Sequence, residues 1–112
     1  MNVLFICSKN KWRSPTAENI FRRYDGVSAR SAGTSRKSRR QVRVTDIRWA
    51  DLIFVMEEKH MSRMRADFRG ELKHKTVHVL DIPDEYGLMD PELIDLITGA
   101  VMPVIDAALY GG

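Results

Sequence analysis

The only cysteine of the chain, Cys7, is followed six positions later by Arg13. A thiol held beside a guanidinium and the start of a helix ionises more readily than a free thiol, and the thiolate is a nucleophile. The five residues between Cys7 and Arg13 allow the chain to curl around a tetrahedral oxyanion, with backbone N–H groups inward and the arginine binding two oxygens. Phosphate fits such a loop. The spacing therefore predicts a phosphate site with Cys7 as nucleophile.

The other residues of this segment are predicted to support the phosphate site. Ser14 can donate its hydroxyl to the sulfur, and Asn10 tolerates a left-handed backbone and can brace the loop through its amide. The residues expected to contact the bound group are Ser8, Lys9, Asn10, Lys11, Trp12 and Ser14. The alternative is that Cys7 is a buried structural residue at the end of a strand, with Arg13 on the surface.

The segments on either side of this loop predict a strand before it and a helix after it. Residues 3–6 form a continuous apolar run, as expected for a strand buried on both faces. Ser14 and Pro15 are typical of a helix start, and one face of that helix carries Ala17, Ile20, Phe21 and Tyr24.

The rest of the chain alternates in the same way, which predicts a three-layer α/β fold: one four-stranded parallel sheet with helices on both faces. Residues 34–41 are the best candidate for a mobile loop, and Pro103 is expected to kink the last helix or break it near Gly99. The expected elements are an edge strand over 27–32, a short helix from Thr45–Asp46 to Ala50, a strand over 51–56, a helix over 57–68, a strand over 76–80 and a helix after Asp90.

The loop and two further segments resemble the low-molecular-weight protein tyrosine phosphatases. The resemblance covers the run from Val3 through Cys7 to Glu18, then Ser31–Thr34 and Ala50–Met56. Lys9 and Trp12 stand where that family usually has Gly and a second Cys, and a segment after Thr34 is missing. The resemblance implies a short, divergent member with a flavodoxin-like strand order. It also implies hydrolysis of phosphotyrosine in proteins through a phosphocysteine, without metal or other cofactor.

A phosphatase of this kind needs a general acid for the leaving oxygen, and three aspartates compete for that role. Asp84 lies in a segment similar to the family's acid loop, beyond the end of the 76–80 strand, and Tyr86 follows it as a predicted wall of the pocket. Asp81 is the reserve choice. Asp90 precedes Pro91 at the start of an apolar-periodic helix, so we interpret it as a helix cap. Trp12 is expected to form another wall or to pack in the core.

Length and composition predict one domain, residues 1–112, without disulfide or metal staples. A single cysteine excludes an internal disulfide and favours a reducing compartment, and no apolar run of membrane-spanning length is apparent, so we expect a cytoplasmic protein without membrane contacts. The histidines lack metal-ligand spacing, and surface or helix-cap roles are expected for His60, His74 and His78.

Two other functions remain open at this point. From Arg30 to Arg48 the chain has seven basic residues and one nearby acid, Asp46. Such a patch could bind nucleic acid. A solvated face is favoured, because no aromatic residues are interleaved before Trp49. With Lys9 in the loop, the chain could be a non-catalytic phosphate or nucleic-acid binding module. Related enzymes act on phosphoarginine, but the cation of Lys11 should disfavour a guanidinium. A phosphorylated protein is the expected partner, with phosphate or sulfate in the loop, and the sequence does not predict an oligomeric state.

Overall fold

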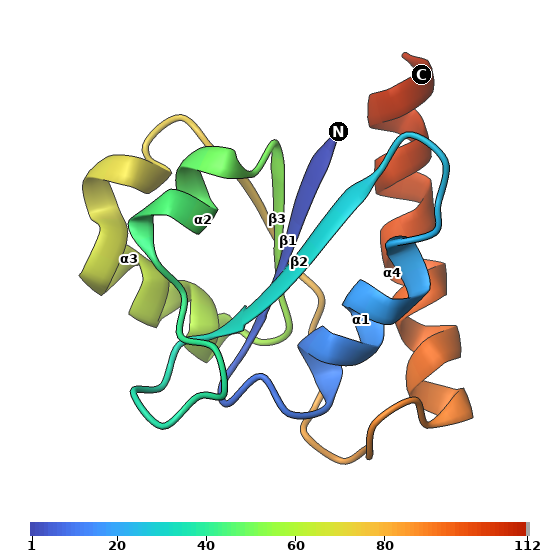
Figure 1. The fold of residues 1–112 in the computed structure, drawn as a ribbon, viewed down its shortest axis with the longest axis horizontal. Coiled ribbons are helices and arrows are strands. Elements are labelled where there is room, and N and C mark those ends of the chain that lie inside the picture. Colours follow the sequence, from blue (N-terminus) through green and yellow to red (C-terminus); the bar gives the residue numbers. More distant parts are fainter. Residues whose placement is uncertain (112) are drawn as a thin grey trace.

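The computed structural model describes residues 1–111 and consists of four strands and four helices in strict alternation. Figure 1 shows the sheet in the centre with helices on both sides. The elements, in chain order, are β1 Asn2–Cys7, α1 Arg13–Phe21, β2 Ser28–Gly33, α2 Val44–Trp49, β3 Leu52–Val55, α3 Glu58–Leu72, β4 Thr76–Val79 and α4 Pro91–Tyr110.

The four strands form one parallel sheet in the order β2-β1-β3-β4. This confirms the predicted α/β class, the flavodoxin-like order and the edge position of β2. Cys7 is the last residue of β1 and pairs with Gly33 at the end of β2. The carboxyl ends of β1, β2 and β3 therefore meet at one edge, which is where open parallel sheets bind ligands.

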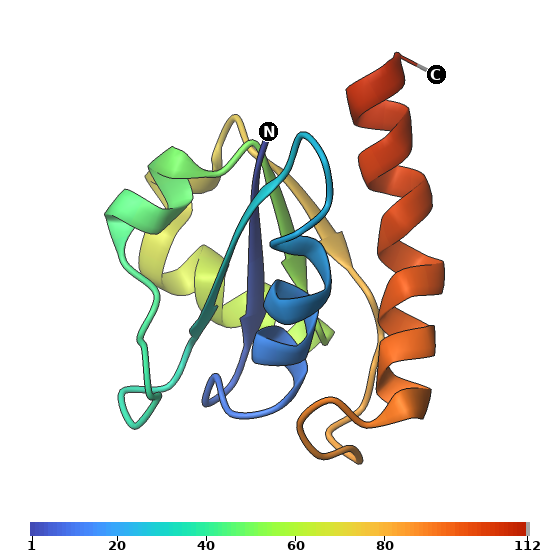
Figure 2. The same cartoon turned by 45° about the vertical axis from the view of Figure 1, so that its right-hand side comes forward.

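Alternate residues of β1 enter two different cores, because successive side chains of a strand point to opposite faces. Val3, Phe5 and Cys7 lie in the core covered by α1 and α4. Leu4 and Ile6 lie in the core covered by α2 and α3. Figure 2 shows the two helix layers on either side of the sheet. Burial on both faces explains why β1 is a continuous apolar run.

The helix boundaries differ from the predictions at three places. Ser14 does not precede α1, which begins at Arg13 without a side-chain cap, because the serine hydroxyl is used inside the loop instead. Helix α3 extends to Leu72, with a non-helical backbone at Phe68, where the predicted helix ended. Helix α4 runs from Pro91 to Tyr110 without a break, although it contains Pro103.

Helix α4 also corrects the expectation that no segment could span a membrane. It has 20 residues, an 18-residue window within it has a mean hydropathy of 1.6, and it is the one helix among residues 1–111 that is long and apolar enough to do so. Its apolar stripe, however, has an internal partner, because it packs on α1 and the sheet and is fully buried at Leu93, Ile97, Val101 and Ile105. A core helix of a globular protein meets the same criteria of length and composition.

Candidate active site

Cys7 lies at the base of a loop between β1 and α1, and its thiol contacts Ser14. The side chain is 3% exposed, and Sγ is 2.9 Å from Ser14 Oγ. The Ser14 hydroxyl also lies within hydrogen-bonding distance of Asn10 Oδ1, at 2.9 Å, and of Ala32 O, at 3.4 Å. A hydroxyl has one hydrogen, so it can rotate from an oxygen acceptor to the sulfur when the thiol ionises. Ser14 and Asn10 thus brace the nucleophile as predicted from sequence.

The backbone of the loop is strained at Asn10 and not at Lys9. Asn10 has a φ of 55° and is buried, whereas Lys9 is not among the residues with positive φ in the described chain, residues 1–111. Asparagine is one of the few residues that adopts this left-handed conformation readily. The lysine therefore fits the loop without strain, and its exposed side chain extends away from the backbone.

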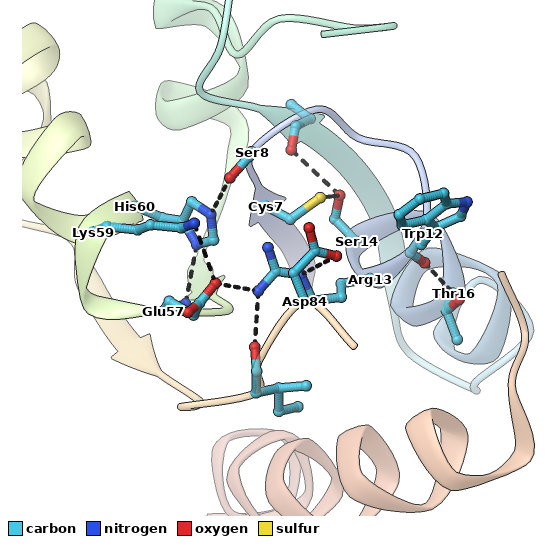
Figure 3. A network of polar contacts seen from close by, with 12 residues as sticks. Cys7, Ser8, Trp12, Arg13, Ser14, Thr16, Glu57, Lys59, His60 and Asp84 are labelled. Atoms are coloured by element: carbon cyan, nitrogen blue, oxygen red, sulfur yellow. Dashed lines mark hydrogen bonds and ion pairs between the residues drawn. The ribbon is translucent and has the colours of Figure 1, made fainter. Parts of the chain in front are cut away.

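Arg13 is buried and held by two acceptors on one of its nitrogens. The residue is 2% exposed, and Nη1 donates to Glu57 Oε2 at 2.5 Å and to Ile82 O at 2.8 Å. Within residues 1–111, no protein acceptor lies on Nη2, so this nitrogen remains for a ligand. The hydrogen bond from Arg13 lowers the pKa of Glu57, which keeps this partner charged. Figure 3 shows the guanidinium between Glu57 and Asp84, below Cys7.

Ser8 is linked to a buried histidine of α3. His60 Nδ1 accepts a hydrogen bond from Glu57 N at 3.0 Å, so the ring proton lies on Nε2, which is 2.8 Å from Ser8 Oγ and donates to it. Burial and the nearby Arg13 lower the pKa of His60 from 6.5 to about 4, which keeps the ring neutral at physiological pH. The predicted helix-cap role of His60 is confirmed. Its link to Ser8 was not predicted.

The segment predicted as a mobile loop is hydrogen-bonded to the phosphate loop. Ser35 N donates to Ser8 O at 2.9 Å, and Arg39 N donates to Lys9 O at 3.1 Å. Gly33 lies between the two segments, and a Cβ at this position would lie 2.5 Å from Ser8 O. The absence of a side chain at Gly33 therefore allows residues 34–41 to pack against the loop that holds the nucleophile.

Of the three competing aspartates, Asp84 lies in the site. Its Oδ1 is 3.7 Å from Arg13 Nε, and the side chain is half exposed. The segment that carries Asp84 is anchored just before it, because Ile82 is buried, donates its N–H to Met56 O at 2.9 Å and accepts from Arg13 through its carbonyl. One residue, Pro83, separates this anchor from Asp84, which lines the same hollow as Cys7.

The other two aspartates lie elsewhere. Asp90 caps α4 through a hydrogen bond from Glu92 N to Oδ1 at 2.9 Å, which confirms its predicted structural role. Asp81 is exposed, has a φ of 56° and lines a separate shallow hollow with Glu57, Glu58, Lys59 and Pro83.

A hollow of about 280 Å³ opens above the sulfur, and the predicted site residues line it except Asn10, Ser14 and Tyr86. Trp12 is 43% exposed and forms part of the rim. Tyr86 does not line the hollow: it is half-buried and packs against the core beneath α4, so the geometry does not support its predicted part as a wall. The lining residues are Cys7, Ser8, Lys9, Lys11, Trp12, Arg13, Lys59 and Asp84.

Comparisons with known proteins agree with this geometry. The family model described as "Low molecular weight phosphotyrosine protein phosphatase" matches residues 2–44, which include the whole loop. The matched segment therefore resembles these phosphatases, and it covers less than half of the chain. A comparison with curated protein sequences gives no match.

Solved structures of several phosphatases share the fold over nearly the whole chain. The YwlE arginine phosphatase from Geobacillus stearothermophilus is 20% identical, with a TM-score of 0.76 and coverage of 99% of this chain and 97% of that one. A protein tyrosine phosphatase from Entamoeba histolytica with Hepes in its active site is 22% identical, with a TM-score of 0.75 and coverage of 99% and 98%. The tyrosine phosphatase Wzb from Escherichia coli K30, in complex with phosphate, is 21% identical, with a TM-score of 0.72 and coverage of 92% and 94%.

The site also contains three residues that were not predicted from the sequence to belong to it. Glu57, Lys59 and His60 all follow β3 at the same edge of the sheet as the loop, but they were interpreted only as the start of a helix. A buried arginine needs a carboxylate partner, and Glu57 was available at that edge. No group of three His, Cys, Asp or Glu residues suited to a metal ion occurs within residues 1–111.

Proposed function

We propose that this protein is a cysteine-dependent phosphatase that hydrolyses phosphotyrosine in proteins. The observation that supports this most directly is the position of Cys7 and Arg13 in one small hollow. The sulfur lies at its base beside the Ser14 hydroxyl, and the guanidinium is fixed by Glu57 and Ile82 so that its other side is available to an oxyanion. An anion site built around a nucleophile is what phosphoryl transfer requires.

The proposed reaction has two steps. In the first, the Cys7 thiolate attacks phosphorus, an S–P bond forms, and the P–O bond to the tyrosine breaks while Asp84 gives its proton to the leaving phenoxide. In the second, Asp84 takes a proton from water, the water oxygen attacks phosphorus, and the S–P bond breaks to release phosphate. Arg13 and the loop N–H groups bind the equatorial oxygens throughout, so the developing charge is stabilised without a metal ion.

An aryl phosphate fits the rim of the hollow. The exposed indole of Trp12 gives it an aromatic edge on which a phenyl ring can stack. Phosphoarginine is the second candidate because a solved structure of similar fold is an arginine phosphatase. The lysines around the hollow repel the guanidinium that such a substrate carries. Initial rates on matched phosphotyrosine and phosphoarginine peptides decide between them.

The test is phosphate release from an aryl phosphate by the wild-type chain and by Cys7→Ser. Serine keeps the shape of the side chain but is a far weaker nucleophile at neutral pH, so we expect turnover to be lost. Ser62→Ala, at an exposed position of α3, is the control and should retain wild-type rates. Phosphate binding without release by the wild-type chain would support the non-catalytic binding module instead. Because its single cysteine is a free thiol, we also propose a reducing, cytoplasmic location.

A further inference from the structure

Three lysines surround the opening above Cys7, and they come from two different parts of the chain. Lys9 and Lys11 belong to the phosphate loop, whereas Lys59 is in the first turn of α3. All three are exposed. Figure 3 shows Lys59 and Trp12 on opposite sides of the Cys7–Arg13 pair. The lysines of the rim therefore come both from the loop after β1 and from the start of α3.

These charges exceed what a bound phosphate group needs. The eight residues that line the hollow include four cations and one carboxylate. Arg13 and the loop N–H groups suffice for a phosphate. Glu57 is paired with Arg13 at 2.5 Å and with Lys59 at 3.6 Å, and Asp84 lies 3.7 Å from Arg13, so these two carboxylates offset the charges of Arg13 and Lys59. Neither Lys9 nor Lys11 forms an ion pair within the described residues 1–111; Lys11 Nζ lies 5.7 Å from the ring centre of Trp12. Two rim cations are thus left without a carboxylate.

The neighbouring basic segment has the same sign of charge. Arg36, Lys37 and Arg39 are exposed, and their segment is attached to the phosphate loop through the hydrogen bonds of Ser35 and Arg39. Clefts lined by charges of one sign concentrate ligands of the opposite sign and accelerate their association. Farther along the same segment, Arg40 is already paired with the buried Asp46 at 2.5 Å, whereas Arg36, Lys37 and Arg39 form no ion pair within the described residues 1–111.

We infer that the substrate is a phosphotyrosine flanked by acidic side chains, with Lys9, Lys11 and Lys59 as the residues that select it. This inference rests on the proposed function, because it concerns the same hollow. A phosphotyrosine seated on Cys7 would place its neighbours in the chain over the rim, where Asp or Glu side chains meet the free lysines. Lys11 and Trp12 would act together, with the indole against the phenyl ring and the ammonium beside it.

The first experiment compares phosphotyrosine peptides that differ only in their flanks: acidic, neutral and basic. Exposed ion pairs are each worth about 2- to 5-fold, so with several pairs we expect kcat/KM for the acidic peptide to exceed that of the neutral one by about 10-fold at low salt. The preference should shrink at high ionic strength because exposed charges are screened. Equal rates on acidic and neutral peptides would overturn the inference while leaving the proposed function intact. Absence of release from every peptide would refute the proposed function itself.

The second experiment removes the charges. Lys11→Met and the triple variant Lys9→Met/Lys11→Met/Lys59→Met should lower the acidic-to-neutral ratio by about 3-fold and about 10-fold. Lys73→Met, in a separate basic hollow between α3 and β4, is the matched control and should keep the wild-type ratio. An unchanged ratio in the triple variant would contradict the assignment. Faster release from a 5′-phosphorylated oligonucleotide, or from a small bisphosphate, than from the acidic peptide would also overturn it.

Discussion

Because His60 is buried and hydrogen-bonded to Ser8, we predict that the protein loses stability at mildly acidic pH. His60 is 1% exposed, and its neutral ring uses both nitrogens, one as acceptor from Glu57 N and one as donor to Ser8. Protonation of the ring would put a hydrogen on Nδ1, which now accepts from Glu57 N, so that hydrogen bond would be lost. It would also place a positive charge near Arg13. Burial, followed by the repulsion from Arg13, lowers the pKa of His60 from 6.5 to about 4.

The size of the effect follows from the two pKa values. In the unfolded chain the imidazole takes up a proton as the pH falls below about 6.5, whereas in the folded chain it does so only near 4. The unfolded state therefore binds more protons between these values, and stability falls as the pH falls. The loss is about 2 kcal/mol between pH 7.5 and pH 5.0, and about 3 kcal/mol once the pH is below 4.

The assay is urea unfolding of the wild type and of His60→Gln at pH 7.5 and pH 5.0. Glutamine is a normal capping-box residue at this position and can still accept from Glu57 N, but it does not titrate. We expect the variant to lose less than about 0.5 kcal/mol between the two pH values. His74→Gln, at an exposed histidine, is the control and should show the full wild-type loss. A loss of about 2 kcal/mol in His60→Gln would refute this account.

Three further predictions concern the geometry around the sulfur. Asp84→Asn should lower kcat by about 10²- to 10⁴-fold and remove the high-pH limb of the rate profile, because an amide cannot donate the leaving-group proton. The control Asp81→Asn keeps a residue that tolerates positive φ and should be close to wild type in the same assay. Glu57→Gln leaves the buried Arg13 charge without its partner. It should lower the free energy of unfolding in urea by about 1 to 3 kcal/mol and remove most of the activity. Glu58→Gln, at the exposed neighbour, is the control and should change neither stability nor activity. Gly33→Ala should lower the free energy of unfolding by about 1 to 3 kcal/mol and slow phosphate release, because the new Cβ meets the Ser8 carbonyl. The control Gly70→Ala, where a Cβ would have nothing within 4 Å, should raise the free energy of unfolding by up to about 1 kcal/mol.

The sheet and the loop between Cys7 and Arg13 were predictable because both depend on local patterns. Residues 3–6 had to be buried on both faces, and a loop of this length between Cys7 and Arg13 had to present its N–H groups at the end of that strand. The identity of Asp90 as a cap was equally local, since the Asp-Pro pair at a helix start is self-contained. Such features need no knowledge of what lies across the molecule.

The contacts that support the site could not be predicted because they join distant parts of the chain. Glu57 meets Arg13 across 44 positions, and His60 meets Ser8 across 52. Nothing in the residues around His60 distinguishes a buried ring from a surface one. Ser14 had two predicted roles, at a helix start and as a donor to the sulfur, and in the structure its hydroxyl contacts the thiol and Asn10. Competition between a local role and a long-range role is decided by packing that the sequence does not display.

The loop backbone also bears on the choice between an enzyme and a simple binding module. The module hypothesis depended on Lys9 distorting a loop in which the related phosphatases usually have glycine. Glycine is required only where φ is positive or where a neighbour comes too close, and the positive φ in this loop is at Asn10. Lys9 therefore adds charge to the rim at no cost in backbone strain. Lys9 was the departure from the family pattern that argued most against catalysis. We instead propose that it is one of the residues that select the substrate.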